Sequence, residues 1–443
     1  MTMISKAAFA ALLLAGVGTV VASPAAAKDK QDKQQPQMKL SDAFRKAAAP
    51  AQTALAAGDL ATADTNITAA EAAASSDDEK YIAAELRLQL LAKQNANTGN
   101  DPAAVARANA AYKGPLDSLL GNPKTPVDQR GKLAKARGDI AFGEKDYANA
   151  IKYYTMAQQA GVSDDDLTLG LAQSKVKTGD VAGGVAAIDQ VVKSYEAKGQ
   201  KAPEDFYKYA VGNLYKTNDR AATLDWVKRW LAAYPTTANW RNAIFVFGFQ
   251  GPTAAQLDKT NKVDLYRLLR ATGALADRGD YLEYAQYALD LGLPEEAKTA
   301  IATGKAAGKV PASDSTAVAI GKSADHAIAS EGSLSALATK AASSAKGDLA
   351  QQTADAYLGQ GNYAKAIELY KLALQKGVTK TEATNMHLGI AEAMSGDKAA
   401  AQAPFQAVQS QPAKDVASLW LAYLAKPAAA PAAAPAAAAP SGS

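Results

Sequence analysis

The sequence predicts an all-α protein built from antiparallel helix hairpins. Alanine dominates its apolar residues and aromatic residues make up only 7% of the chain, a composition that suits helices packed closely through small side chains. Between residues 40 and 425, the alternation of apolar and polar residues that is typical of β-strands is almost absent. Short turns of the Gly-Asp type recur along the same stretch and separate helical segments, as in helix–turn–helix hairpins.

The first residues have the form of an export signal. Lys6 supplies the positive charge, residues 7–21 are apolar, and the alanines at 25–27 provide a small-residue cleavage site. The apolar stretch is shorter than the roughly 20 residues that a membrane-spanning helix needs. We therefore expect residues 1–27 to be a cleaved signal peptide, with no stable membrane span afterwards, and the protein to be exported to the periplasm or secreted. The chain has no cysteine, so disulfides would not stabilise it there.

The turn and helix pattern predicts five further segments. They are a flexible polar leader (28–38), an N-terminal helical array (39–235), degenerate helical hairpins (236–347), C-terminal repeats with a capping helix around Trp420 (348–425), and an Ala/Pro-rich disordered tail (426–443).

The spacing of the turns resembles that of the tetratricopeptide repeat. From Lys145 to Gly179 is 34 residues, and from Gly361 to Gly396 is 35. The residues at fixed places also match. Ala354 and Tyr357 precede Ala366 and Tyr370 in one repeat, Leu388 and Gly389 precede Ala401 and Phe405 in the next, and Gly138 precedes Ala150, Tyr154 and Ala157 in an earlier one. The resemblance implies a right-handed superhelix, or solenoid, of such hairpins, in which small residues let paired helices approach and aromatics fill the groove between neighbouring hairpins.

Residues suited to catalysis are scarce. The two histidines, His326 and His387, lie far apart in the sequence, and neither accompanies a nucleophile motif. We expect His387 on a helix face and His326 near a helix start. No calcium-binding or phosphate-binding loop is present, and the net charge of +4 comes without a dense basic run. We therefore predict no enzyme activity, no cofactor, no metal site and no nucleic-acid partner.

The resemblance also implies which residues line the concave face, because in the family certain positions of the first helix of each hairpin contact the ligand. The candidate partner-binding residues are Lys132, Lys135, Phe142, Lys177, Lys208, Tyr215 and Lys216. They form a mildly basic face with apolar patches, which suits an acidic peptide or is simply solvated. Asp139 follows Lys135 where the family's carboxylate clamp has Asn, so that clamp is not supported.

Two further surfaces leave alternatives open. Met386, Ile390 and Met394 form a soft apolar face that either accepts a helix or is buried against the next segment. Aromatic residues crowd positions 206–249, where they are either exposed to bind a glycan or peptide, or buried as core. The sequence thus predicts a non-catalytic scaffold of the cell envelope that binds a peptide or helix in its concave groove. The alternative is a glycan-binding or spacer protein that uses the aromatic segment.

Overall fold

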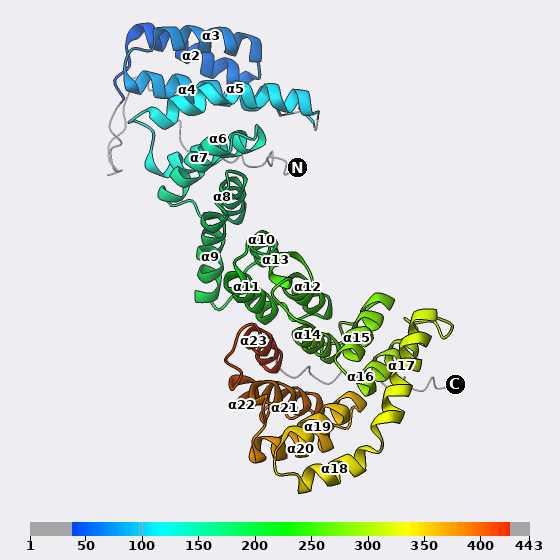
Figure 1. Cartoon of the computed structure of the whole chain (residues 1–443). Helices are drawn as coiled ribbons and strands as arrows, with labels where there is room; N and C mark the ends of the chain where they lie inside the picture. Colours follow the sequence, from blue (N-terminus) through cyan, green and yellow to red (C-terminus); the bar gives the residue numbers. More distant parts are fainter. Residues whose placement is uncertain (1–37, 97, 100, 426–443) are drawn as a thin grey trace, which may run out of the picture. The chain divides into compact units, whose positions relative to one another are not determined.

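The computed structural model describes residues 38–96, 98–99 and 101–425, and these consist of helices and turns with no β-strand among them (Figure 1). This confirms the predicted all-α fold of antiparallel helix hairpins. The predicted signal peptide (1–27) and tail (426–443) lie outside the described residues, as does nearly all of the leader (28–38). Within the described part of the chain, no helix is both long enough and apolar enough to cross a membrane.

The chain divides into two compact units, Met1–Ala202 (unit 1) and Pro203–Ser443 (unit 2). The boundary lies inside the array that the sequence predicts over 39–235. Unit 1 contains the hairpins α2 (Asp42–Ala57) and α3 (Leu60–Ala73), α4 (Asp77–Gln94) and α5 (Pro102–Gly121), α6 (Val127–Gly143) and α7 (Tyr147–Gln159), and α8 (Asp165–Lys177) and α9 (Val181–Ala197).

Unit 2 continues with helices throughout, including the stretch 236–347. Its helices are α10 (Glu204–Leu214), α11 (Arg220–Ala233), α12 (Thr237–Gly248), α13 (Gly251–Ala254), α14 (Lys259–Ala271), α15 (Arg278–Asp290), α16 (Pro294–Ala306), α17 (Ser315–Glu331), α18 (Leu334–Ser343), α19 (Asp348–Gln360), α20 (Tyr363–Lys376), α21 (Thr381–Ser395), α22 (Gln402–Gln406) and α23 (Ala413–Leu424).

The recurrent Gly-Asp-type turns contain residues that cap the helices on either side. Gly361 ends α19 in the left-handed conformation with φ at 82°, which glycine adopts without steric cost. The next residue, Asn362, begins α20 by accepting a hydrogen bond from the backbone N–H of Lys365. Asp146 and Asp180 cap α7 and α9 in the same way. Each turn therefore stops one helix and starts its antiparallel partner.

Small residues and aromatics pack as the repeat resemblance implies. The ring of Tyr154 lies between Gly138 of α6 and Gly170 of α8, where an added Cβ would come within 2.7 and 2.8 Å of the ring. The ring of Phe405 lies against Gly389 of α21 with comparable closeness, 2.9 Å. The aromatic of each second helix thus fills a space that glycine leaves open on a first helix.

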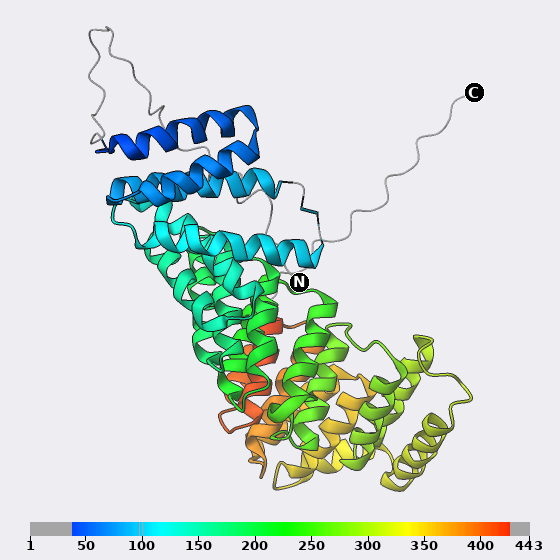
Figure 2. The ribbon, with the colours of Figure 1, turned by 90° about the horizontal axis from the view of Figure 1, so that it is seen from above.

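The helix that contains Trp420 does more than cap the last repeat. Helix α23 turns back onto α11 and α14 of the same unit, and it lies among helices from the start of unit 2 (Figure 1 and Figure 2). Arg220 Nε lies 2.6 Å from Asp415 Oδ2, and Trp420 Nε1 donates to the backbone carbonyl of Asp264 at 3.3 Å. Unit 2 is therefore closed by contacts between residues that lie 195 and 156 positions apart.

Enlarging a small residue between paired helices should destabilise unit 2. Ala366 is fully buried on α20, so Ala366→Leu should overpack the hairpin and cost about 1–3 kcal/mol of unfolding free energy. Urea denaturation followed by circular dichroism measures this cost. Ala364→Leu, at an exposed position on the same helix, is the matched control. Equal stability of the two variants would contradict the packing described here.

A candidate partner-binding face and a buried charge network

The seven predicted partner-binding residues divide between the two units. Unit 1 contains Lys132, Lys135 and Phe142 on α6 and Lys177 at the end of α8. Unit 2 contains the remaining three, Lys208 on α10 followed by Tyr215 and Lys216 just beyond its end. Their side chains range from half-buried, for Lys135, Phe142 and Tyr215, to exposed, for the other four.

Several of these side chains are already engaged within the chain. Lys135 Nζ lies 3.1 Å from Asp139 Oδ2, and Lys208 Nζ lies 3.1 Å from Glu204 Oε2, each one helical turn away. Lys216 Nζ lies 5.9 Å from the ring centre of Tyr215. Phe142 makes an edge-to-face contact with Tyr147 at 5.8 Å between ring centres. The ion pairs make the face less basic than the sequence predicts, because an acid accompanies two of its lysines.

Asp139 links both helices of the α6–α7 hairpin. Its Oδ1 accepts a hydrogen bond from the Tyr154 hydroxyl at 2.9 Å, and its Oδ2 accepts one from Lys135 at 3.1 Å. Burial raises the pKa of Asp139 above its ordinary value, against the opposing effect of Lys135 and Tyr154. The side chain of Asp139 is nevertheless 19% exposed.

Unit 2 repeats this arrangement in the α19–α20 hairpin. Asp355 accepts a hydrogen bond from the Tyr370 hydroxyl at 2.6 Å and another from Gln351 Nε2 at 2.5 Å. Aspartate and tyrosine are 15 residues apart in both hairpins, and the aspartate is four residues after its second donor in both. The two hairpins therefore use the same register.

The face around this motif is covered in unit 2 and open in unit 1. When the hairpin turns are aligned, Asp139, Phe142, Leu169, Gln173 and Val176 of unit 1 correspond to Asp355, Leu358, Met386, Ile390 and Ala393 of unit 2. The residues of unit 1 are only half-buried, whereas those of unit 2 are all buried. Of the two alternatives for the apolar face at Met386 and Ile390, burial is the one observed.

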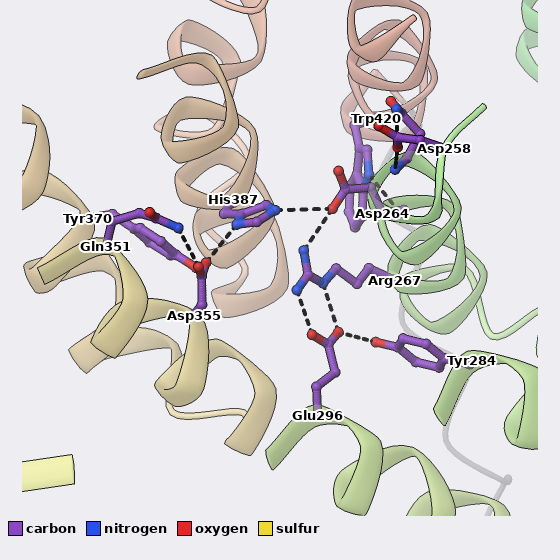
Figure 3. Close-up of polar contacts among 11 residues, drawn as sticks. Asp258, Asp264, Arg267, Tyr284, Glu296, Gln351, Asp355, Tyr370, His387 and Trp420 are labelled. Atoms are coloured by element: carbon purple, nitrogen blue, oxygen red, sulfur yellow. Dashed lines mark hydrogen bonds and ion pairs between the residues drawn. The ribbon is translucent and has the colours of Figure 1, made fainter. Parts of the chain in front are cut away.

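A network of buried charges lies beside this covered face in unit 2 (Figure 3). Its centre is Arg267 of α14, whose guanidinium makes two parallel contacts to Glu296 of α16, at 2.8 and 2.5 Å. The same guanidinium lies 2.7 Å from Asp264 Oδ1. Tyr284 of α15 donates to Glu296. Helix α19 also packs closely against α16, because Gly359 of α19 leaves room for the backbone of Glu296.

His387 joins this network to the α19–α20 hairpin. Its Nδ1 lies 2.7 Å from Asp355 Oδ1, and its Nε2 lies 3.5 Å from Asp264 Oδ1. The first distance is that of a charge-assisted hydrogen bond, whereas the second is a longer ion-pair contact. As expected, His387 lies on a helix, but its side chain is buried and contacts two carboxylates. His326, expected near a helix start, is exposed in the second half of α17.

The carboxylates favour a protonated His387. Burial alone would lower the pKa of His387, but Asp355 and Asp264 outweigh burial and raise it above its ordinary value. Burial raises the pKa of Asp264, against the effects of His387 and Arg267. For Glu296 and Asp355 burial is outweighed, by Arg267 and His387 respectively, and their pKa values are lowered. The charged side chains of this network come from four different helices, α14, α16, α19 and α21, so the sequence pattern of a single hairpin does not reveal it.

The aromatic segment 206–249 is largely core. Trp226, Trp230 and Trp240 are all buried, and Trp230 Nε1 donates to Glu204 at 3.0 Å. Tyr207 lies edge-to-face against Trp226 and Tyr234. Of the two alternatives for this segment, burial as core is the one observed for these three tryptophans. Within the described part of the chain, no group of His, Asp and Glu side chains is arranged to hold a metal ion.

Comparison with known proteins identifies no family. No protein-family model matches the chain, and no curated protein matches it. Among solved structures, the chain is similar to one described as the crystal structure of the yeast Tom70, with 10% sequence identity and a TM-score of 0.21 over 87% of this chain and 89% of that one. At this TM-score the likeness supports no inference about function.

Removing the arginine at the centre of the network should destabilise unit 2 strongly. Arg267→Met leaves Asp264 and Glu296 buried without their cation, which should cost about 3–5 kcal/mol. All four tryptophans lie in unit 2, so tryptophan fluorescence during urea denaturation reports this loss. Lys365→Met, which removes a more exposed pair with Glu368, should cost no more than about 1 kcal/mol. A similar small loss for both variants would contradict a structural role of the network.

Protonation of His387 should make unit 2 more stable in mild acid. Because the folded-state pKa of His387 is raised above its unfolded value of about 6.5, its contribution is complete below that pH and is lost as the pH rises through the folded pKa. The folded-state pKa of Asp264 is also raised, so protonation of Asp264 likewise stabilises unit 2 as the pH falls. Fluorescence-detected melts at pH 6 and above should therefore show a falling melting temperature, and His387→Gln should flatten that dependence. If the melting temperature of the variant fell with pH as steeply as that of the unsubstituted protein, the pH dependence would come from other groups.

Proposed function

We propose that the protein is a non-catalytic scaffold of the cell envelope that binds a segment of another protein. The binding surface is the face of α6 and α8 formed by Asp139, Phe142, Leu169, Gln173 and Val176. The observation that supports this is the difference between two equivalent faces. In unit 2, side chains of other helices cover Asp355, Leu358, Met386 and Ile390, whereas the corresponding face of unit 1 keeps half-exposed polar and apolar side chains. Such a face suits a helix or peptide from a partner, which would cover it as the chain's own helices cover the equivalent face of unit 2.

The predicted residues of unit 1 fit this role. Phe142 offers a half-exposed aromatic ring, and Lys132 and Lys177 offer exposed charges on α6 and α8. Aromatic anchors surrounded by polar side chains are the usual composition of a protein-binding surface. His387 is held by Asp355 and Asp264 in the interior of unit 2, which supports a structural rather than a catalytic use of that side chain. The envelope location rests on the export signal predicted over residues 1–27.

Site-specific photo-crosslinking in the native cells tests the proposal. A benzophenone amino acid in place of Gln173, half-exposed on α8, should yield discrete crosslinked proteins, because a partner would lie against that face. Gln190, exposed on the second helix of the same hairpin, is the matched control and should yield none of them. Absence of products at Gln173, or the same products at both positions, would refute binding at this face. Fractionation of the same cells measures the location.

A further inference from the structure

We propose that the partner segment presents a basic side chain, such as arginine, to the carboxylate of Asp139. This inference rests on the proposed function and names the chemistry of its partner. The lysines alone suggest an acidic partner, whereas this inference gives the partner a basic side chain at Asp139. The argument comes from unit 2, where the chain shows which side chains accompany the same motif when its face is covered.

In unit 2 the covered face meets cations. Asp355, which corresponds to Asp139, binds His387 at 2.7 Å. Arg267 of α14 lines the same small cavity as Leu358, Ile390 and Met394, together with its ion-pair partner Glu296 of α16. Both Arg267 and His387 contact Asp264 (Figure 3). In the aligned register, these three apolar residues correspond to Phe142, Gln173 and Lys177 of unit 1. Within this chain a cation therefore lies against the carboxylate of this motif, and an arginine of a covering helix lies beside it, where it contacts Asp264 and Glu296.

Unit 1 has no histidine of its own for Asp139. The position that corresponds to His387 is Gly170, and an added Cβ there would lie only 2.8 Å from the Tyr154 ring. Lys135 takes the place of Gln351 and neutralises the carboxylate from one side. Tyr154 occupies Oδ1 with its hydroxyl. Beside these two partners the side chain of Asp139 stays 19% exposed.

Covering Asp139 has an electrostatic consequence. Lys135 already pairs with this carboxylate. A partner that excludes water from this face removes the remaining hydration of Asp139, which disfavours its charge unless a further cation compensates. Asp164, at the start of α8, adds a further negative charge whose field acts on Asp139. An acidic partner side chain would increase this repulsion, whereas a guanidinium would relieve it and could also make paired hydrogen bonds.

Three synthetic peptides test the preference on the full chain. Each carries the α14 sequence, residues 258–272, with Arg, Gln or Glu at position 267, and binding is measured by fluorescence anisotropy. The Arg peptide should bind at least about tenfold more tightly than the Glu peptide, with Gln between them. Asp139→Asn should reduce that difference to less than about threefold, because the side chain keeps its shape and loses its charge.

A matched variant controls for general charge. Asp189→Asn removes the acid of another Lys–Asp pair one helical turn apart, on α9 of the same unit, and should leave the tenfold preference unchanged. Preference for the Glu peptide, an Arg preference that survives Asp139→Asn, or no saturable binding of any peptide would each overturn the inference. Crosslinking at Gln173 would still succeed if the face binds a partner of other chemistry, so the two failures are distinguishable.

Discussion

The structure of unit 2 depends on one buried guanidinium. Arg267 holds Glu296 through two parallel contacts and Asp264 through a third, so a single side chain ties α14 to α16. Removing such a charge from water is costly, and its carboxylate partners repay the cost only when the geometry is good. The pair therefore favours one arrangement of helices over others that would leave an acid without its cation. His387 extends the same constraint to α19 and α21.

Local features of the fold could be predicted because they arise within one hairpin. The turn at Gly361 needs a left-handed residue followed by a cap, and both requirements are visible in two adjacent letters of the sequence. The place of Tyr154 against Gly138 follows in the same way from the repeat register. The return of α23 onto α11 could not be predicted, because nothing in the sequence near Asp415 indicates a partner 195 residues earlier.

The candidate site shows the same limit. The repeat register predicts Lys135 and Phe142 as partner-binding residues of α6. The four-residue spacing of Lys135 and Asp139 is also the spacing of an ion pair within one helix. That the equivalent face at Asp355 is covered could not be predicted, because Arg267 and Glu296 come from hairpins with weak repeat character. His387 looked like an ordinary helix residue, because its two acids come from α14 and α19. Charges that meet only in the tertiary structure leave no periodic signal.

The return of α23 also bears on the order in which the chain can fold. The contacts of unit 1 join helices that are close in sequence, so its hairpins can pack one after another while synthesis continues. Unit 2 cannot bury Trp420 against α14 until nearly the whole chain has been made. Until then Asp264 and the apolar surface around it lack their final cover. The final packing of unit 2 therefore requires its last helix, whereas the hairpins of unit 1 need only their neighbours.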